Sequence, residues 1–229
     1  MPSVLAALDV SGDPNTLGLP ALSRCGVLLV DGLGAELLTR HQAEARWTSG
    51  RLPVQSQVVD IQQVALTMSH PETAAAFYRD VLELPVSTDG GRVAVTIGSS
   101  SLVLERGEQF HGVHHLAVGI APADFELARS WLSQRVAPIS VDGSEVIDGP
   151  EGWDSKSLYF LGPEDIVLEY IARQAHGHLP VSKGPVPRPL SLSEVGIGVP
   201  DVQEAVGDLH RVLDLPPLPS PGLKVRSGR

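Results

Sequence analysis

The stretch VALTMSHPETAAAFYRDVLELPV, residues 64–86, decides the fold. It opens with apolar and β-branched residues that are typical of a strand, and Pro71 then suits the first turn of a helix. The spacing of Ser69 and Glu72 also predicts a capping box at that helix start. The residues after Pro71 place an apolar stripe at helical spacing, formed by Ala74, Phe77, Tyr78, Val81 and Leu82. The stretch therefore predicts a strand over 60–68 and a helix over 71–82.

The same order of elements then recurs along the chain. A strand and a helix are followed by three strands, and a second strand, helix and three strands come after them. The expected second helix spans 123–135, and the other expected strands span 92–98, 101–105, 113–120, 137–141, 145–148, 156–161 and 165–172. We therefore expect an α+β protein with two βαβββ units in a domain over 58–173.

A third, partial copy follows a proline-rich linker over 174–190. The segment SEVGIGVPDVQEAVGDLHRVLDLPPL, residues 193–218, repeats the opening strand and helix at an offset of 131, which aligns Glu194 with Gln63. We expect residues 191–229 to form a truncated module.

The N-terminal residues 1–50 have a different character and are joined by a polar linker over 51–57. An apolar strand at Val27–Val30, a turn from Asp31 and a helix from about Ala35 are typical of a parallel sheet covered on both faces.

Composition limits the functions that the chain can have. Its 229 residues are 42% hydrophobic and 19% charged, a balance typical of folding around a core. The formal net charge of −10 argues against nucleic-acid binding and against anionic membranes. A single cysteine, Cys25, excludes an internal disulfide framework and is typical of the cytoplasm, where we expect the protein. We expect neither a signal peptide nor a membrane-spanning helix.

Three motifs carry a family resemblance. They are AFYRDVLELPV (76–86), HHLAV (114–118) and YFLGPEDIVLEYI (159–171). With them, residues 58–173 resemble the vicinal oxygen chelate superfamily, which includes glyoxalase I, extradiol dioxygenases and bleomycin-resistance proteins. The resemblance extends weakly to 191–217. It implies paired βαβββ units that form a curled mixed sheet around a cleft, which in that superfamily usually holds a divalent metal.

A separate resemblance covers the N-terminal residues. The motif VLLVDGLGAELL (27–38) is similar to the first strand and turn of the alkaline phosphatase and nucleotide pyrophosphatase superfamily. This resemblance implies that Asp31 is a metal ligand. The other parts of that fold are not in the chain, so we interpret 1–50 as a fragment joined to a different domain.

Strand alternation identifies the candidate ligands. Gln63, His115 and Glu169 fall on strand faces with small residues, while the bulkier apolar faces should pack against helices. We therefore expect these three side chains to converge in the cleft. The superfamily's ligand positions fall on the same residues, so the resemblance implies a divalent-metal site, for which we expect Zn, Ni, Fe or Mn. For an enzyme, we expect Glu169 or a metal-bound hydroxide to be the proton shuttle.

The chain departs from both enzyme patterns that the resemblance offers. Extradiol dioxygenases have histidine where Gln63 stands, and glyoxalase-type sites add a glutamate where this chain has Val103. Glu105, on the same strand face as Val103, could serve only through a register slip or a bulge. Glu194 occupies the matching first-strand position of the third copy, without the strands that complete that copy.

Three functions therefore remain open. The first is a metal-dependent lyase, isomerase or dioxygenase that acts on a small oxygen-chelating substrate. The second is a protein that binds a small molecule without chemistry, as resistance proteins of the superfamily do. The third is an inactive product of a chimeric or truncated gene. An uncovered sheet edge also predicts a homodimer.

Overall fold

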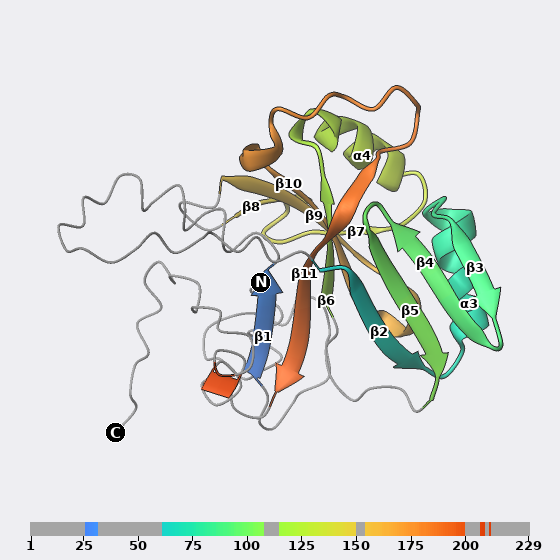
Figure 1. Ribbon diagram of the computed structural model, residues 1–229. Helices are drawn as coiled ribbons and strands as arrows, with labels where there is room; N and C mark the ends of the chain where they lie inside the picture. Colours follow the sequence, from blue (N-terminus) through green and yellow to red (C-terminus); the bar gives the residue numbers. More distant parts are fainter. Residues whose placement is uncertain are drawn as a thin grey trace, which may run out of the picture.

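The computed structural model describes residues 26–31, 61–107, 115–149 and 154–199, together with Gly207, Asp208 and Arg211. Within these ranges the strands form a seven-stranded and a four-stranded sheet, accompanied by the helices α3 and α4 (Figure 1). The protein is therefore α+β, as the sequence predicts. Among the described residues, no helix has the length and apolar character needed to cross a membrane.

The four-stranded sheet is the first βαβββ unit. Its elements in chain order are β2 (Gln63–Met68), α3 (Pro71–Ala76), the π-helical turn η1 (Phe77–Val81), β3 (Val86–Asp89), β4 (Arg92–Ile97) and β5 (Ser100–Arg106). Strands β3, β4 and β5 pair antiparallel in succession, and β5 lies parallel to β2. The order β2-β5-β4-β3 thus places the first and last strands of the unit side by side.

The second unit repeats this arrangement. Its elements are β6 (His115–Ile120), η2 (Pro122–Asp124), α4 (Phe125–Leu132), β7 (Pro138–Ile139), β8 (Val146–Asp148), β9 (Ser155–Leu161), η3 (Pro163–Asp165) and β10 (Val167–Arg173). Strand β10 is parallel to β6 and antiparallel to β9. The short strands β7 and β8 pair with successive residues of β9 and together take the position that β3 has in the first unit. The order β6-β10-β9-β7 again places first and last strands together, so the predicted pair of βαβββ units is confirmed.

The third copy contributes a strand to the second unit. After the short turn η4 (Gln174–His176), strand β11 (Pro189–Val199) pairs antiparallel with β6. Strand β1 (Gly26–Asp31) then pairs antiparallel with β11 and completes the order β1-β11-β6-β10-β9-β7 (Figure 1). The free edge of β6 is therefore occupied by β11.

The expectation of a parallel sheet around the N-terminal strand is wrong. Strand β1 is antiparallel to β11, its partner in the described chain. A parallel neighbour is reached through a βαβ crossover, whereas β11 comes from the far end of the sequence and pairs without one. The helix expected from about Ala35 and most of the helix expected after β11 lie outside the described residues.

Side chains alternate along the strands of the second unit, so one face of the sheet packs in the core and the opposite face carries other residues. The buried core cluster contains alternate residues of β6, β9 and β10 with the inner face of α4, namely Leu116, Val118, Ile120, Leu158, Phe160, Leu168, Tyr170, Phe125, Ala128 and Trp131. The other face of β6 carries His115, Ala117 and Gly119. The predicted packing of the bulkier faces against the helices is confirmed.

Strand β11 also joins the second unit to the first. The Leu192 amide donates to the Ser100 Oγ at 2.8 Å, and this hydroxyl donates to the Ile61 carbonyl at 2.6 Å. The Ser99 amide donates to the Leu190 carbonyl at 2.9 Å. The turn between β4 and β5 is thus fastened to the start of β11.

The predicted capping box at Ser69 is wrong. His70 is the residue at the N-cap of α3, and no side chain caps the helix. The Glu72 carboxylate instead accepts hydrogen bonds from Arg106 at 2.6 and 2.7 Å, and Arg106 also donates to the Ser69 carbonyl. A charged guanidinium is a stronger partner for a carboxylate than a backbone amide, which explains the difference.

Candidate metal centre

Three adjacent strands bring three ionisable side chains together. His115 lies on β6, Glu169 on β10 and Glu194 on β11. Ala117 of β6 is the Cα partner of both Glu169 and Glu194. Directly opposite residues project from the same face of a sheet, so the two carboxylates lie on either side of one small residue.

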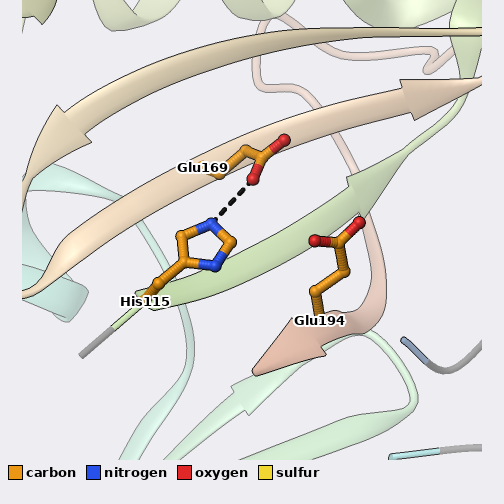
Figure 2. Close-up of side chains that lie close together, drawn as sticks. All are labelled: His115, Glu169 and Glu194. Atoms are coloured by element: carbon orange, nitrogen blue, oxygen red, sulfur yellow. Dashed lines mark hydrogen bonds and ion pairs between the residues drawn. The ribbon is translucent and has the colours of Figure 1, made fainter. Parts of the chain in front are cut away.

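The three side chains form a buried cluster. One ligand atom from each of His115, Glu169 and Glu194 lies within 4.8 Å of those of the other two. The Nε2 of His115 is 2.7 Å from an oxygen of Glu169, and Figure 2 shows the Glu194 carboxylate on another side of the ring. Each of the three residues is only 2% exposed. Charged groups are buried to this degree only when partners or a metal compensate them.

The second imidazole nitrogen of His115, Nδ1, is the other notable atom of the cluster. Its Nδ1 is buried and has no hydrogen-bond partner among the described residues. Gly196 stands directly opposite His115, and a Cβ built there would be 2.8 Å from the His115 Cβ and 3.3 Å from Nδ1. The glycine therefore leaves room beside the ring. A buried polar atom without a partner is uncommon, and an imidazole nitrogen is a frequent metal ligand.

We expect Gly196→Ala to displace the His115 ring and to destabilise the fold by about 1–3 kcal/mol, since the new methyl group overpacks a buried contact. Urea unfolding measures this loss. Gly119→Ala is the matched control on the same face, because a Cβ there makes only ordinary contacts of 3.7 Å or more. Equal stability of the two variants would contradict the proposed packing around His115.

The charges around Glu169 keep it ionised. Burial alone would raise the pKa of Glu169, but the hydrogen bond and charge of His115, a hydrogen bond from Ser157 and the charge of Arg173 lower it below its usual value. Burial and the negative charge of Glu169 raise the pKa of the half-buried Tyr159, the Cα partner of Glu169 on β9. Near neutral pH, Glu169 is therefore a carboxylate and Tyr159 retains its proton.

A buried arginine completes the cluster. The Arg173 guanidinium donates to Glu194 through Nη2 and to the Ser193 hydroxyl through Nη1, and the residue is 2% exposed. Sequence reasoning did not identify Arg173 as part of the site. The available signal was its position four residues after Glu169, which places both on one face of the same strand.

The structure places the candidate ligands in two different regions. It brings His115 and Glu169 into contact, whereas Gln63 is exposed on β2 of the four-stranded sheet and lies outside the buried cluster. The expected convergence of three side chains therefore holds for two of them. Glu194 takes the place expected for Gln63 because β11, the first strand of the third copy, pairs with β6.

Glu105 and Asp31 are the two additional candidate ligands, and they lie on different strands. Strand β5 stays in regular register with β2 and β4, so neither the slip nor the bulge that Glu105 would need occurs. The Glu105 carboxylate forms an exposed salt bridge with Arg92 at 2.9 Å. Asp31 ends β1, and its Cα partner is Glu194. Its role as a metal ligand stays a prediction.

Comparisons with known proteins give similarities of fold at low identity. No protein-family model matches the sequence, and no curated protein matches it. A lactoylglutathione lyase from Agrobacterium tumefaciens is similar at 21% identity and a TM-score of 0.39, covering 49% of this chain and 92% of that one. A glyoxalase/bleomycin resistance protein/dioxygenase from Nocardioides is similar at 20% identity and a TM-score of 0.40, covering 64% of this chain and 98% of that one.

A third similarity is to an integron cassette protein from the mobile metagenome of the Halifax Harbour sewage outfall. It has 21% identity and a TM-score of 0.40, and it covers 49% of this chain and 97% of that one. The strand order of this protein is what identifies it as a pair of βαβββ units.

Proposed function

We propose that this protein is a divalent-metal-dependent enzyme of the lyase, isomerase or dioxygenase type, acting on a small substrate that chelates the metal through oxygen atoms. The observation that carries the proposal is the cluster of His115, Glu169 and Glu194, whose ligand atoms lie within 4.8 Å of one another on three neighbouring strands. The paired βαβββ units agree with the fold that the sequence resemblance implies.

The donor set fits a divalent ion. One imidazole and two carboxylates suit Mn, Fe or Zn, and three protein ligands leave coordination positions open for a substrate. Ligand atoms at about 2.1 Å from one ion are about 3–3.5 Å apart, so the side chains would move inward by on the order of 1 Å. The unpartnered Nδ1 of His115 supports the same assignment.

The chain's own residues supply the acid–base chemistry. A divalent ion held there would polarise the oxygens of a chelating substrate and acidify the neighbouring C–H or O–H group. Glu169, with its lowered pKa, is in the carboxylate form that a ligand or a proton acceptor requires. Tyr159 retains its proton beside Glu169 and can hold this carboxylate in place. The burial of the cluster excludes bulk water.

Elemental analysis of the untagged protein tests the metal site. We expect about one divalent ion per chain in the wild type and a large loss of metal in Glu169→Gln, which preserves the shape of the side chain but removes a charged ligand. Glu105→Gln is the matched control, because it alters an exposed carboxylate on the other sheet. A wild-type protein that takes up no Zn, Ni, Fe or Mn after reconstitution would eliminate the proposal.

Turnover by the metal-loaded protein tests the chemistry. Suitable substrates are thiol adducts of 2-oxoaldehydes for the lyase or isomerase reaction and catechols under oxygen for the dioxygenase reaction. A non-catalytic binding protein is the second candidate, favoured by the departures from the enzyme patterns at Gln63 and Val103. Tight binding of these compounds without turnover would favour that second function.

A further inference from the structure

We propose that Arg173 is a positioning residue of the metal centre, which holds the irregularity in strand β11 that turns Glu194 toward the other ligands. This inference rests on the proposed function, because it concerns the ligands of the same site. Three observations carry it: the pairing of β11 with β6, the two side-chain contacts of Arg173, and the small residues on the strand between Arg173 and Glu194.

The pairing of β11 with β6 changes register just before Glu194. Leu192 is the Cα partner of Val118, and Glu194 is the Cα partner of Ala117. Two steps along β11 thus correspond to one step along β6. Ser193 is therefore an extra residue on β11, as in a β-bulge.

This irregularity decides which face of the sheet carries Glu194. Leu192 and Glu194 are two residues apart, so in a regular strand both side chains would lie on one face. Leu192 is instead part of the buried core and Val195 packs against it, whereas Glu194 lies in the cluster of candidate ligands. If the pairing continued without the shift, Ser193 would stand opposite Ala117, and Glu194 would turn toward the core.

Arg173 contacts both residues at the irregularity. Its guanidinium donates to the Ser193 hydroxyl through Nη1 and to the Glu194 carboxylate through Nη2, and all three residues are buried. Neighbouring side chains of a regular strand point to opposite faces, so one guanidinium can contact both only while the irregularity is present. The fixed fork of donors on Arg173 therefore favours the register that brings Glu194 to the cluster.

Small residues of β6 leave room for this contact. Arg173 lies on β10 and Glu194 on β11, with β6 between the two strands. Neighbouring strands are about 4.8 Å apart, so the two side chains together span roughly 10 Å of sheet. Ala117 and Gly119 are the β6 residues that follow His115 on this face, and neither has a side chain large enough to separate the pair.

The affinity for cobalt(II) tests the role of Arg173. Removing a positive charge beside a cation site would by itself strengthen cation binding, whereas releasing Glu194 from the site removes a ligand and weakens it. We expect Arg173→Met to weaken cobalt(II) binding at least about tenfold, the effect that outer-shell partners have on metal sites. The visible absorption of the bound cobalt(II) should match that of Glu194→Gln, because both variants lose the same ligand. Neither measurement needs turnover.

Deletion of Ser193 tests whether Arg173 acts through the irregularity. Without Ser193, Leu192 and Glu194 become neighbours, and regular alternation alone keeps Glu194 opposite Ala117. We expect Arg173→Met to cause no loss of cobalt(II) affinity in this background. An equal loss with and without Ser193 would overturn the positioning role.

Cobalt stoichiometry separates this inference from the proposed function. If the wild-type protein binds no cobalt(II), the proposed metal site fails and the inference fails with it. If it binds one equivalent and Arg173→Met binds as tightly or more tightly, only the role of Arg173 fails. Arg92→Met is the matched control and should bind like wild type, because its salt bridge with Glu105 is exposed on the other sheet.

A second variant carries the test if Arg173→Met does not fold. Ser193→Ala removes one of the two contacts at the irregularity and keeps the charge of Arg173. We expect about fivefold weaker cobalt(II) binding, as the loss of one hydrogen bond implies. Unchanged binding by Ser193→Ala would then overturn the inference.

Discussion

Glu194→Gln is expected to weaken the binding of a divalent ion at least about 100-fold, while Gln63→Ala leaves it unchanged. Loss of an outer-shell partner of a metal ligand already costs about 10–100-fold, and loss of a charged ligand costs more. Glu194 belongs to the buried cluster, whereas Gln63 is exposed on the other sheet. The pair therefore compares the candidate ligand that lies beside His115 in the structure with the candidate ligand that the sequence resemblance implies.

Metal affinity is measured by competition with a chromophoric chelator, and thermal unfolding verifies that Glu194→Gln is folded. This control is needed because Glu194→Gln also removes a negative partner of Arg173. Weak metal binding by Gln63→Ala, together with normal binding by Glu194→Gln, would restore the ligand set of the resemblance. It would also mean that β2 lies beside β6 in the active protein.

Gly98→Ala is expected to destabilise the fold by about 3–4 kcal/mol. Gly98 lies in the turn between β4 and β5 with a φ of +58°, and a Cβ there would be 2.0 Å from the Leu190 carbonyl oxygen. A left-handed backbone costs a residue with a side chain roughly 1–2 kcal/mol, and overpacking adds about 1–3 kcal/mol. The clash is with backbone at the start of β11, so relief requires the turn to separate from that strand.

Gly90→Ala is the matched control for this prediction. Gly90 lies in the turn between β3 and β4 with a φ of +56°, but nothing lies within 4 Å of a Cβ built there. We expect a loss of only about 1–2 kcal/mol, from backbone strain alone. Urea unfolding of the two variants measures the difference. Similar losses at both positions would show that the turn at Gly98 does not pack against Leu190.

Much of the fold could be predicted because its signals are local. The alternation of HLAVGI in β6 and VLEYIAR in β10 correctly assigned Leu116 and Leu168 to the core and His115 and Glu169 to the opposite face. Strand β3 was missed because VSTD is short and largely exposed, and therefore lacks an apolar pattern. The helix over 71–82 was predicted correctly from its apolar stripe, although its last turn is π-helical.

The third member of the site could not be chosen from local pattern. The internal repeat aligned Glu194 with Gln63, so the sequence contained two first strands that could each border β6. Arg173 could not be assigned either. Its partners Ser193 and Glu194 are neighbours in the sequence, and both can contact it because the pairing of β11 with β6 shifts register between Leu192 and Glu194, as in a β-bulge. A bulge of this kind depends on the pairing of two strands and leaves no fixed mark on one of them.

The sequence by itself determined the βαβββ order, the apolar face of each strand and the placement of His115 and Glu169 on a common face of the sheet. These features follow from side-chain periodicity along single segments. Only the tertiary structure decided that β11 rather than β2 borders β6, and hence that Glu194 and Arg173 join the cluster. Strands pair through backbone groups that are the same in every residue, so the choice between two distant strands depends on the packing of the whole chain.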